Sequence, residues 1–147
     1  MKLALTLLLT AICGVAAAAP SRGGGVPITA QALALGQFHA TTIRATTGTA
    51  VLDRITIEPG GNFGWHTHGA PVAVVVTGGT LTVFDPTVGG CKPFKVSKGQ
   101  SFVEPANHVH LARNDGHVAV TLYAMYLGLP KPAQANVPAS RPSGCAA

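Results

Sequence analysis

The sequence predicts an all-β fold, either a sandwich or a closed barrel. From residue 51 onward, short runs of β-forming residues follow one another, and glycine or proline turns separate them. No long segment between these turns has the 3.6-residue periodicity of an amphipathic helix. Many short strands without a long helix are typical of sandwiches and barrels.

Both ends of the chain are expected to lie outside this fold. Residues 1–18 begin with the positive Lys2, continue as an apolar run and end in small residues, the three-part form of a signal peptide cleaved after Ala18. The apolar run is shorter than the about 20 residues that a membrane span needs. We therefore expect a secreted or periplasmic protein with no membrane contact after cleavage. Residues 19–27 are predicted to be a flexible lead-in, and residues 130–147 a Pro/Ala-rich tail.

The predicted barrel domain is the segment between these ends, residues 28–129, whose length suits one core. Its first part, residues 28–45, has mixed periodicity, which leaves open a short helix followed by a strand, or two strands. A strand is predicted before the breaker Pro59-Gly60-Gly61, where Val51, Asp53, Ile55 and Ile57 alternate with Leu52, Arg54, Thr56 and Glu58.

The middle of the domain predicts a buried strand and a hairpin. Residues 72–76 are continuously apolar, as expected of a strand buried on both faces. Leu81 and Val83 alternate with threonines directly after Gly78-Gly79, which predicts a hairpin at the glycine pair. Further strands are expected at residues 94–97, 101–104, 109–113 and 118–127.

The charge of the chain argues against a nucleic-acid partner. Removing Lys2 from the ten basic residues leaves nine against five acidic ones, a net charge of +4. These basic residues are scattered apart from Lys92, Lys95 and Lys98, and no basic stripe is interleaved with aromatic residues.

Two cysteines remain after the predicted cleavage, Cys91 and Cys145. In an oxidising compartment they are candidates for a disulfide, which would tie the tail to the barrel. Closing a loop of that size is worth roughly 4 kcal/mol in the chain-entropy model. Two unrelated thiols are the alternative.

Two histidine-containing segments carry the chemistry. In the first, Gly60 is followed by five residues and then by His66-Thr67-His68, and Gly79 ends the segment. In the second, about thirty residues later, the spacing continues through the residues Gly99, Pro105, His110 and Asn114.

These two segments resemble the motifs of the cupins, over residues 50–127. Asn107 stands where the second motif has a glycine, and asparagine tolerates the same left-handed conformation. The resemblance implies a cupin-type double-stranded β-helix, or jelly-roll barrel. It also implies a divalent metal ion held by His66, His68 and His110.

The physical chemistry of the segments agrees with that implication. On a strand, His66 and His68 share a face, while Phe63 and Trp65 point the other way, into packing. His110 can meet them only if the sheet curls. Three neutral imidazoles with open positions suit Fe, Mn, Ni, Cu or Zn. The alternative is three polar residues hydrogen-bonded near the mouth of a barrel.

One departure from the family matters for the metal. The family's metal-binding glutamate falls on Val72, which cannot coordinate, so a divalent cation would be held less tightly. The thiol dioxygenases of the wider superfamily function with three histidines, so the metal site is still expected. His108 shares strand parity with His110 and is a further candidate ligand. Glu104 is either a partner that orients an imidazole or an exposed carboxylate at a strand edge.

The expected function is a secreted, metal-binding cupin whose barrel accepts a small molecule. Val72, Val74 and Phe102 are predicted to line that pocket beside the histidines. If the protein is an enzyme, a dioxygenase-like reaction is expected, because dry apolar walls protect reactive intermediates from water. A non-catalytic module that binds a small ligand beside a degenerate metal site is the alternative. A homodimer that pairs edge strands is a third expectation.

Overall fold

The computed structural model describes residues 30–39 and 41–145, so the predicted signal peptide and lead-in lie outside the described residues. The chain divides into two compact units, residues 1–32 and 33–147, and the fold described is that of the second. Its elements are β1 (Thr49–Ile57), β2 (Asn62–Thr67), β3 (Val72–Gly78), β4 (Thr80–Phe84), β5 (Phe94–Ser97), β6 (Ser101–Glu104), β7 (His110–Arg113), β8 (Val120–Leu129), the 3-10 helix η1 (Pro132–Ala135) and β9 (Val137–Pro138). Within the described residues, no helix is long and apolar enough to cross a membrane.

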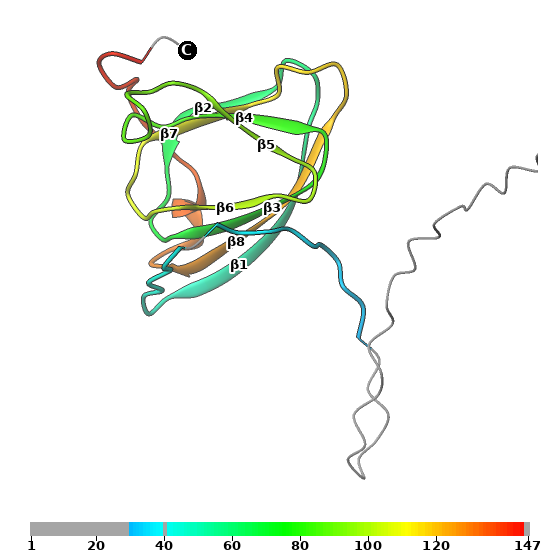
Figure 1. The fold of residues 1–147 in the computed structure, drawn as a ribbon. Coiled ribbons are helices and arrows are strands. Elements are labelled where there is room, and N and C mark those ends of the chain that lie inside the picture. Colours follow the sequence, from blue (N-terminus) through cyan, green and yellow to red (C-terminus); the bar gives the residue numbers. More distant parts are fainter. Residues whose placement is uncertain (1–29, 40, 146–147) are drawn as a thin grey trace, which may run out of the picture. The chain divides into compact units, whose positions relative to one another are not determined.

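The strands form two antiparallel sheets that face each other (Figure 1). The first has the order β1-β8-β3-β6 and is called the wall sheet. The second has the order β5-β4-β7-β2-β9 and is called the histidine sheet, because it carries His66 and His110. The predicted all-β barrel of the double-stranded β-helix type is confirmed.

The main hydrophobic core fills the space between the two sheets. Along β8, Val120, Leu122, Ala124 and Tyr126 alternate with more exposed residues and point inward. Such period-2 alternation is what a sheet with one buried face requires. The other buried members of this core are Ile57, Ala70, Val72, Val74, Val76, Leu81, Val83, Val96, Ala112 and Leu129.

The outer face of β3 corrects one prediction. Val72, Val74 and Val76 are buried, but Ala73 and Val75 on the opposite face are only half-buried. Residues 33–38 pass beside this face and cover it in part, leaving a shallow apolar groove. The prediction that residues 72–76 form a strand buried on both faces is therefore wrong.

The glycine pair at residues 78 and 79 corrects a second prediction. It does not form a hairpin, because β3 pairs with β6 and β8, while β4 pairs with β5 and β7. The pair instead carries the chain from the wall sheet to the histidine sheet. Gly79 has a φ of 69°, and a Cβ atom there would lie 2.7 Å from the carbonyl oxygen of Ala119. A glycine is therefore needed at this crossing for both backbone conformation and space.

The other expected strands lie close to their predicted places. The last long strand is Val120–Leu129, two residues later than predicted at each end. In the described part of residues 28–45, Gln37 forms a bridge with Gln100, and no helix or longer strand is present.

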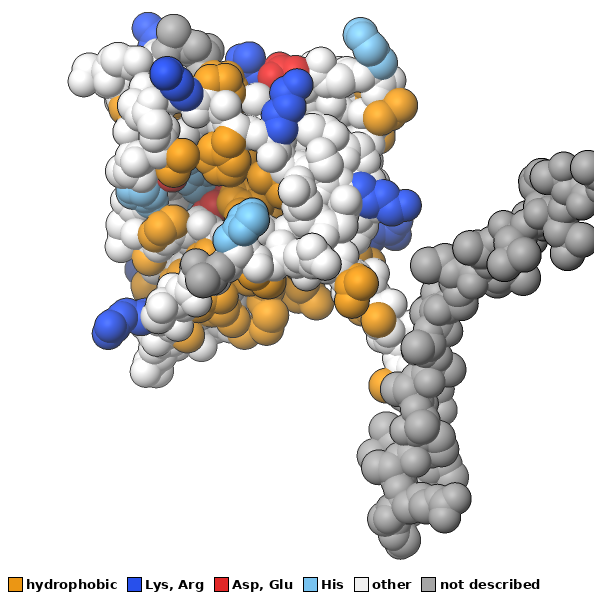
Figure 2. All heavy atoms as spheres, in the orientation of Figure 1, with side chains coloured by type: hydrophobic (Ala, Val, Ile, Leu, Met, Phe, Trp, Pro, Cys, Tyr) orange, Lys and Arg blue, Asp and Glu red, His pale blue; other side chains and the backbone are white. Residues whose placement is uncertain are grey.

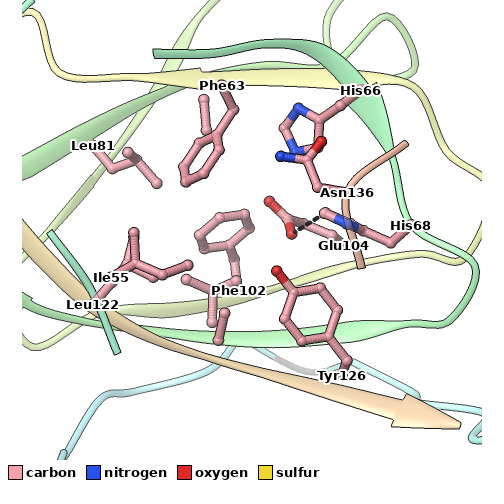
Figure 3. A pocket seen from close by; sticks show the side chains of 13 residues that line it. Ile55, Phe63, His66, His68, Leu81, Phe102, Glu104, Leu122, Tyr126 and Asn136 are labelled. Carbon is pink, nitrogen blue, oxygen red and sulfur yellow. Dashed lines mark hydrogen bonds and ion pairs between the residues drawn. The ribbon is translucent and has the colours of Figure 1, made fainter. Parts of the chain in front are cut away.

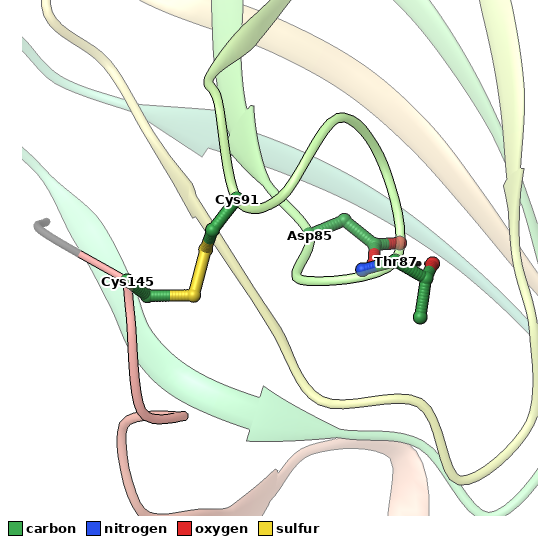
Figure 4. The surroundings of a disulfide bond; sticks show 4 residues. All are labelled: Asp85, Thr87, Cys91 and Cys145. Atoms are coloured by element: carbon green, nitrogen blue, oxygen red, sulfur yellow. Dashed lines mark hydrogen bonds between the residues drawn. A yellow bond between two sulfur atoms is a disulfide. The ribbon is translucent and has the colours of Figure 1, made fainter.

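After Leu129 the chain returns to the histidine sheet. β9 pairs with β2, and the backbone amide of Ala139 donates to the carbonyl of Trp65. A disulfide joins Cys91 and Cys145, which are 54 residues apart in the sequence (Figure 4). Both cysteines belong to a second, small hydrophobic cluster with Phe84 and Leu111, against which Trp65 packs.

Candidate metal centre

Three buried imidazoles converge between the two sheets. His66 and His110 are direct partners across the antiparallel pair β2–β7, so their side chains share a face. His68 follows two residues after His66 and points the same way. The ring centroids are 4.4 Å apart for His66 and His110 and 4.9 Å apart for the other two pairs. Each ring offers one nitrogen, and these nitrogens lie within 4.8 Å of one another.

Backbone carbonyls orient all three rings in the same manner. His66 Nδ1 lies 2.9 Å from the carbonyl oxygen of Gly64, and His110 Nδ1 lies 2.9 Å from that of His108. His68 Nδ1 is hydrogen-bonded to the carbonyl of Ala135. A carbonyl oxygen only accepts hydrogen bonds, so each Nδ1 carries the proton. In a neutral ring the lone pair is then on Nε2, the atom that faces the centre.

The acceptor atoms at the centre fit a metal ion. The buried Nε2 of His110 has no hydrogen bond of adequate geometry in the described part of the chain. A buried polar atom without a partner is costly. Hydrogen bonding of the opposite ring nitrogen to a carbonyl is the usual way in which proteins orient a metal-binding histidine. The three residues therefore fit a divalent transition metal with nitrogen ligands.

Glu104 at the end of β6 faces the same centre (Figure 3). Its Oε2 lies 3.1 Å from His68 Nε2 and its Oε1 lies 3.2 Å from His110 Nε2. Only 12% of the Glu104 side chain is exposed, so it is not an edge carboxylate in solvent. Burial by itself raises the pKa of Glu104, but interactions with His110 and His68 outweigh it and lower the pKa to about 2.

In the metal-free site, the surroundings shift the pKa values of His66 and His110 in opposite directions. Burial and, to a smaller extent, the neighbouring rings of His110 and His68 lower the pKa of His66 to about 4, against the raising effect of the Gly64 carbonyl. Burial also lowers the pKa of His110, but the contact with Glu104 outweighs burial and raises it. His66 is therefore neutral at pH 7 and ready to act as a ligand.

A small cavity opens from the histidines between the sheets. Figure 3 shows His66, His68, Glu104 and Asn136 at one end and Ile55, Leu81 and Leu122 at the other. Its volume is about 30 Å³. Of the predicted pocket residues, Val74 and Phe102 line the cavity. Val72 is fully buried in the core and is not among its walls.

A bulge in β2 corrects the predicted direction of Phe63. The register of β2 with β7 shifts between Asn62 and Trp65, and Gly64 has a φ of 69°. This bulge reverses the alternation, because the strand gains one residue. Phe63 therefore lines the cavity, with its ring centroid 5.5 Å from that of His66, whereas Trp65 packs against the disulfide cluster as expected.

The remaining histidines lie outside the cluster. The side chain of His108 turns to Asp85, with Nδ1 3.3 Å from Oδ2, so His108 contributes only its carbonyl oxygen to the centre. His39 and His117 are exposed. The candidate His108 is thus not brought together with the other three.

Sequence reasoning missed three contributors to the site. Tyr126 lines the cavity, and its ring is 5.3 Å from that of His68. Burial and the charges of Glu104 and Asp53 raise its pKa to about 12, so it is a protonated hydrogen-bond donor. The alternation of the last strand could have placed it inward. Ala135 contributes the backbone carbonyl that is hydrogen-bonded to His68, and Asn136 lines the cavity. Both belong to the predicted tail, and neither position has a recognisable sequence signal.

Asn114, the last residue of the second motif, has a structural role. It is fully buried, and its Nδ2 donates to the carbonyls of Ile57 and Val118 while its Oδ1 accepts from the amide of Gly116. It thereby fixes the turn after β7. Asn107 adopts a φ of 59°, the left-handed conformation expected of the glycine that it replaces.

Comparisons with known proteins agree with this fold. The family model described as a cupin domain matches residues 53–126, half of the chain. Among solved structures, the polyketide cyclase RemF from Streptomyces resistomycificus matches at 15% identity and a TM-score of 0.52, covering 67% of this chain and 66% of the cyclase. A Bacillus halodurans protein matches at 20% identity and a TM-score of 0.50, covering 60% of this chain and 69% of that protein.

A third solved structure, the oxalate decarboxylase of Bacillus subtilis, has 18% identity and a TM-score of 0.49, covering 55% of this chain and 22% of the decarboxylase. No curated protein matches the sequence. The chain spans 66%, 52% and 40% of the lengths of the first three solved structures that it matches. At these identities the matches show the fold alone.

Proposed function

The chain belongs to the cupin family, and from its three converging imidazoles we propose that it is a metal-dependent enzyme of the oxygenase type acting on a small molecule. The observation that carries the proposal is that all three Nδ1 atoms are bonded to backbone carbonyls, so that three Nε2 lone pairs face one point. Preorganised ligands of this kind favour Fe, Mn, Ni, Cu or Zn.

The division of the cavity supports a substrate with a polar head and an apolar body. When bound, the ion supplies Lewis acidity and open coordination positions to a chelating oxygen of the substrate. At that end, the Tyr126 hydroxyl and the Asn136 amide are available to hydrogen-bond the head. The rings of Phe63 and Phe102 and the apolar residues beyond them exclude water from the reaction. A small phenolic or anionic chelator fits this arrangement.

Elemental analysis tests the metal. Protein purified without a chelator and without a nickel-affinity step is expected to contain close to one equivalent of a transition metal. The His66→Ala/His68→Ala double variant is expected to lose it, whereas His117→Ala, which removes an exposed histidine, keeps it. Equal metal in the double variant and the wild type would contradict the proposed site.

Oxygen consumption then tests the reaction. The metal-loaded protein is expected to consume oxygen with small phenolic or anionic chelators, and the double variant is not. A second candidate function, ligand binding without turnover, rests on Val72, which stands where the family has its metal-binding glutamate. It predicts saturable binding of such compounds with no oxygen uptake by the fully loaded protein.

We also propose that the protein is exported. The form of residues 1–18 and the Cys91–Cys145 disulfide both favour an oxidising compartment. Mass spectrometry of the protein from its native host is expected to find an N-terminus at Ala19 in the periplasmic or extracellular fraction. Full-length protein in the cytoplasm would contradict export.

A further inference from the structure

This chain has Val72 where the family pattern has a carboxylate, but it carries a carboxylate on the neighbouring strand. β3 and β6 are antiparallel partners, and their register places Val72 directly opposite Glu104. Opposite residues of an antiparallel pair project to the same face, with Cβ atoms about 5 Å apart. The side chain of Glu104 therefore projects from the strand next to Val72, the position of the family's glutamate, and extends into the same space.

The distances around Glu104 are those of ligands that share one ion. Its two oxygens lie 3.1 Å and 3.2 Å from the Nε2 atoms of His68 and His110. Two ligand atoms bound at about 2.1 Å are about 3.0 Å apart at a right angle and about 3.4 Å apart at the tetrahedral angle. Both observed distances lie between these values.

The contacts of Glu104 with His68 and His110 require a cation, because the neutral rings have no proton on Nε2 to donate. In both rings Nδ1–H donates to a backbone carbonyl, so Nε2 of the neutral ring has no proton and can only accept. A carboxylate oxygen is also an acceptor. Two acceptors at about 3 Å repel unless a cation lies between them, and that cation is either a second proton on the ring or a metal ion.

We propose that Glu104 is the fourth protein ligand of the metal, supplied by β6 in place of the family's glutamate on β3. This inference rests on the proposed metal site and adds its carboxylate. The centre then has three histidines and one carboxylate, and a divalent ion in it keeps a net charge of +1. The negative charge that Val72 fails to provide is thereby restored, which favours tight binding.

Cobalt(II) binding to the full chain tests the proposal. Glu104→Gln keeps the size of the side chain but removes the charge, and we expect cobalt(II) affinity to fall at least about 100-fold, the upper end of what loss of a mere orienting partner costs. The visible spectrum of the bound cobalt is also expected to change, because a carboxylate leaves its coordination. Glu58→Gln, which removes an exposed carboxylate, is the matched control and leaves both unchanged.

A swap of the two positions tests the geometry. Glu104→Val should bind cobalt(II) as poorly as Glu104→Gln, while Val72→Glu/Glu104→Val returns the carboxylate to β3 and should bring the affinity back to within about 10-fold of the wild type. The direct register of residues 72 and 104 is the reason to expect this rescue. A swap no better than Glu104→Val would contradict the shared position.

The wild-type protein provides a test that does not depend on the folding of variants. The chain has only two glutamates, Glu58 and Glu104. With ¹³C-labelled glutamate, infrared difference spectra of zinc-loaded minus metal-free protein should show one glutamate carboxylate band shifting on coordination.

The outcomes separate the two proposals. If the wild type binds no metal, or if the His66→Ala/His68→Ala variant binds it equally well, the proposed function fails and this inference fails with it. If the wild type binds metal through the histidines but Glu104→Gln has the same affinity and cobalt spectrum, or the labelled band does not shift, only this inference is overturned. Glu104 would then only form an ion pair with a protonated histidine and would not be a metal ligand.

Discussion

The two sheets contribute to the site in different ways. The histidine sheet supplies His66 and His110, contacts the disulfide cluster through Trp65 and Leu111, and has β9 of the returning segment as an edge strand. The wall sheet supplies Glu104, Tyr126 and most of the apolar lining of the cavity. On its other face, apolar side chains such as Leu52 are exposed. Figure 2 shows hydrophobic side chains gathered on the surface of the molecule. The orientation of the histidine rings thus depends on contacts with backbone carbonyls, one of them from the returning segment, whereas the wall sheet is held by ordinary core packing.

The largest effect is expected from breaking the attachment on the histidine sheet. Cys91→Ala/Cys145→Ala removes a link across 54 residues, which costs about 4 kcal/mol of unfolding free energy in the chain-entropy model. Because the Ala135 carbonyl that orients His68 belongs to the same returning segment, metal affinity should fall as well. Urea unfolding and metal titration measure the two effects. Reduction of the wild type should reproduce both, and unchanged metal affinity would show that the segment holds His68 without the disulfide.

A core truncation on the wall sheet is expected to separate stability from metal binding. Leu122→Ala removes a buried side chain and should cost about 3 kcal/mol of unfolding free energy. It touches none of the histidine–carbonyl contacts, so the metal-free variant should bind metal as the wild type does. Leu52→Ala, at an exposed position of the same sheet, should change stability by less than about 0.5 kcal/mol. A large loss of metal affinity in Leu122→Ala would mean that metal binding also depends on the core packing of the wall sheet.

The bulge in β2 is expected to give a smaller but local effect. Gly64 has a φ of 69°, and a Cβ atom added there would meet no other atom within 4 Å, so Gly64→Ala costs only conformational strain, about 1–2 kcal/mol. The carbonyl of this residue orients His66, so metal affinity should fall too. Gly99→Ala is the matched control, since Gly99 also has a positive φ and open space but lies between β5 and β6. Equal metal affinity in both variants would contradict a role of the bulge in placing His66.

The same contrast between local and long-range contacts explains what the sequence could predict. Strand parity predicted that His66 and His68 share a face, and the resemblance to the cupin motifs implied that His110 joins them. Phe63 was misplaced because one left-handed glycine reverses the alternation, and a bulge depends on the partner strand as much as on its own sequence.

The pairing of strands could not be deduced from local pattern either. The glycine pair at residues 78 and 79 has the composition of a hairpin turn, and only the sheet assignments of β3 and β4 show that it joins two sheets. In the same way, the closeness of Glu104 to the position of Val72 follows from the register of β3 with β6, which sets two residues side by side although they are far apart in the sequence.

The two sheets are also expected to act in different pH windows in the metal-free protein. The pKa of His66 falls from 6.5 to about 4 on folding, so the unfolded chain binds the proton first and stability declines as the pH drops from 6.5 to about 4. The pKa of Glu104 falls from 4.5 to about 2, so its contribution is complete above pH 4.5 and is lost as the pH drops towards 2. Urea unfolding of chelator-treated protein should therefore show a shallower decline between pH 6.5 and 4 in His66→Ala. Glu104→Gln should instead flatten the decline below pH 4.5. If each variant altered the other's window, the two groups would titrate as one coupled unit, and the division between the sheets would not extend to their electrostatics.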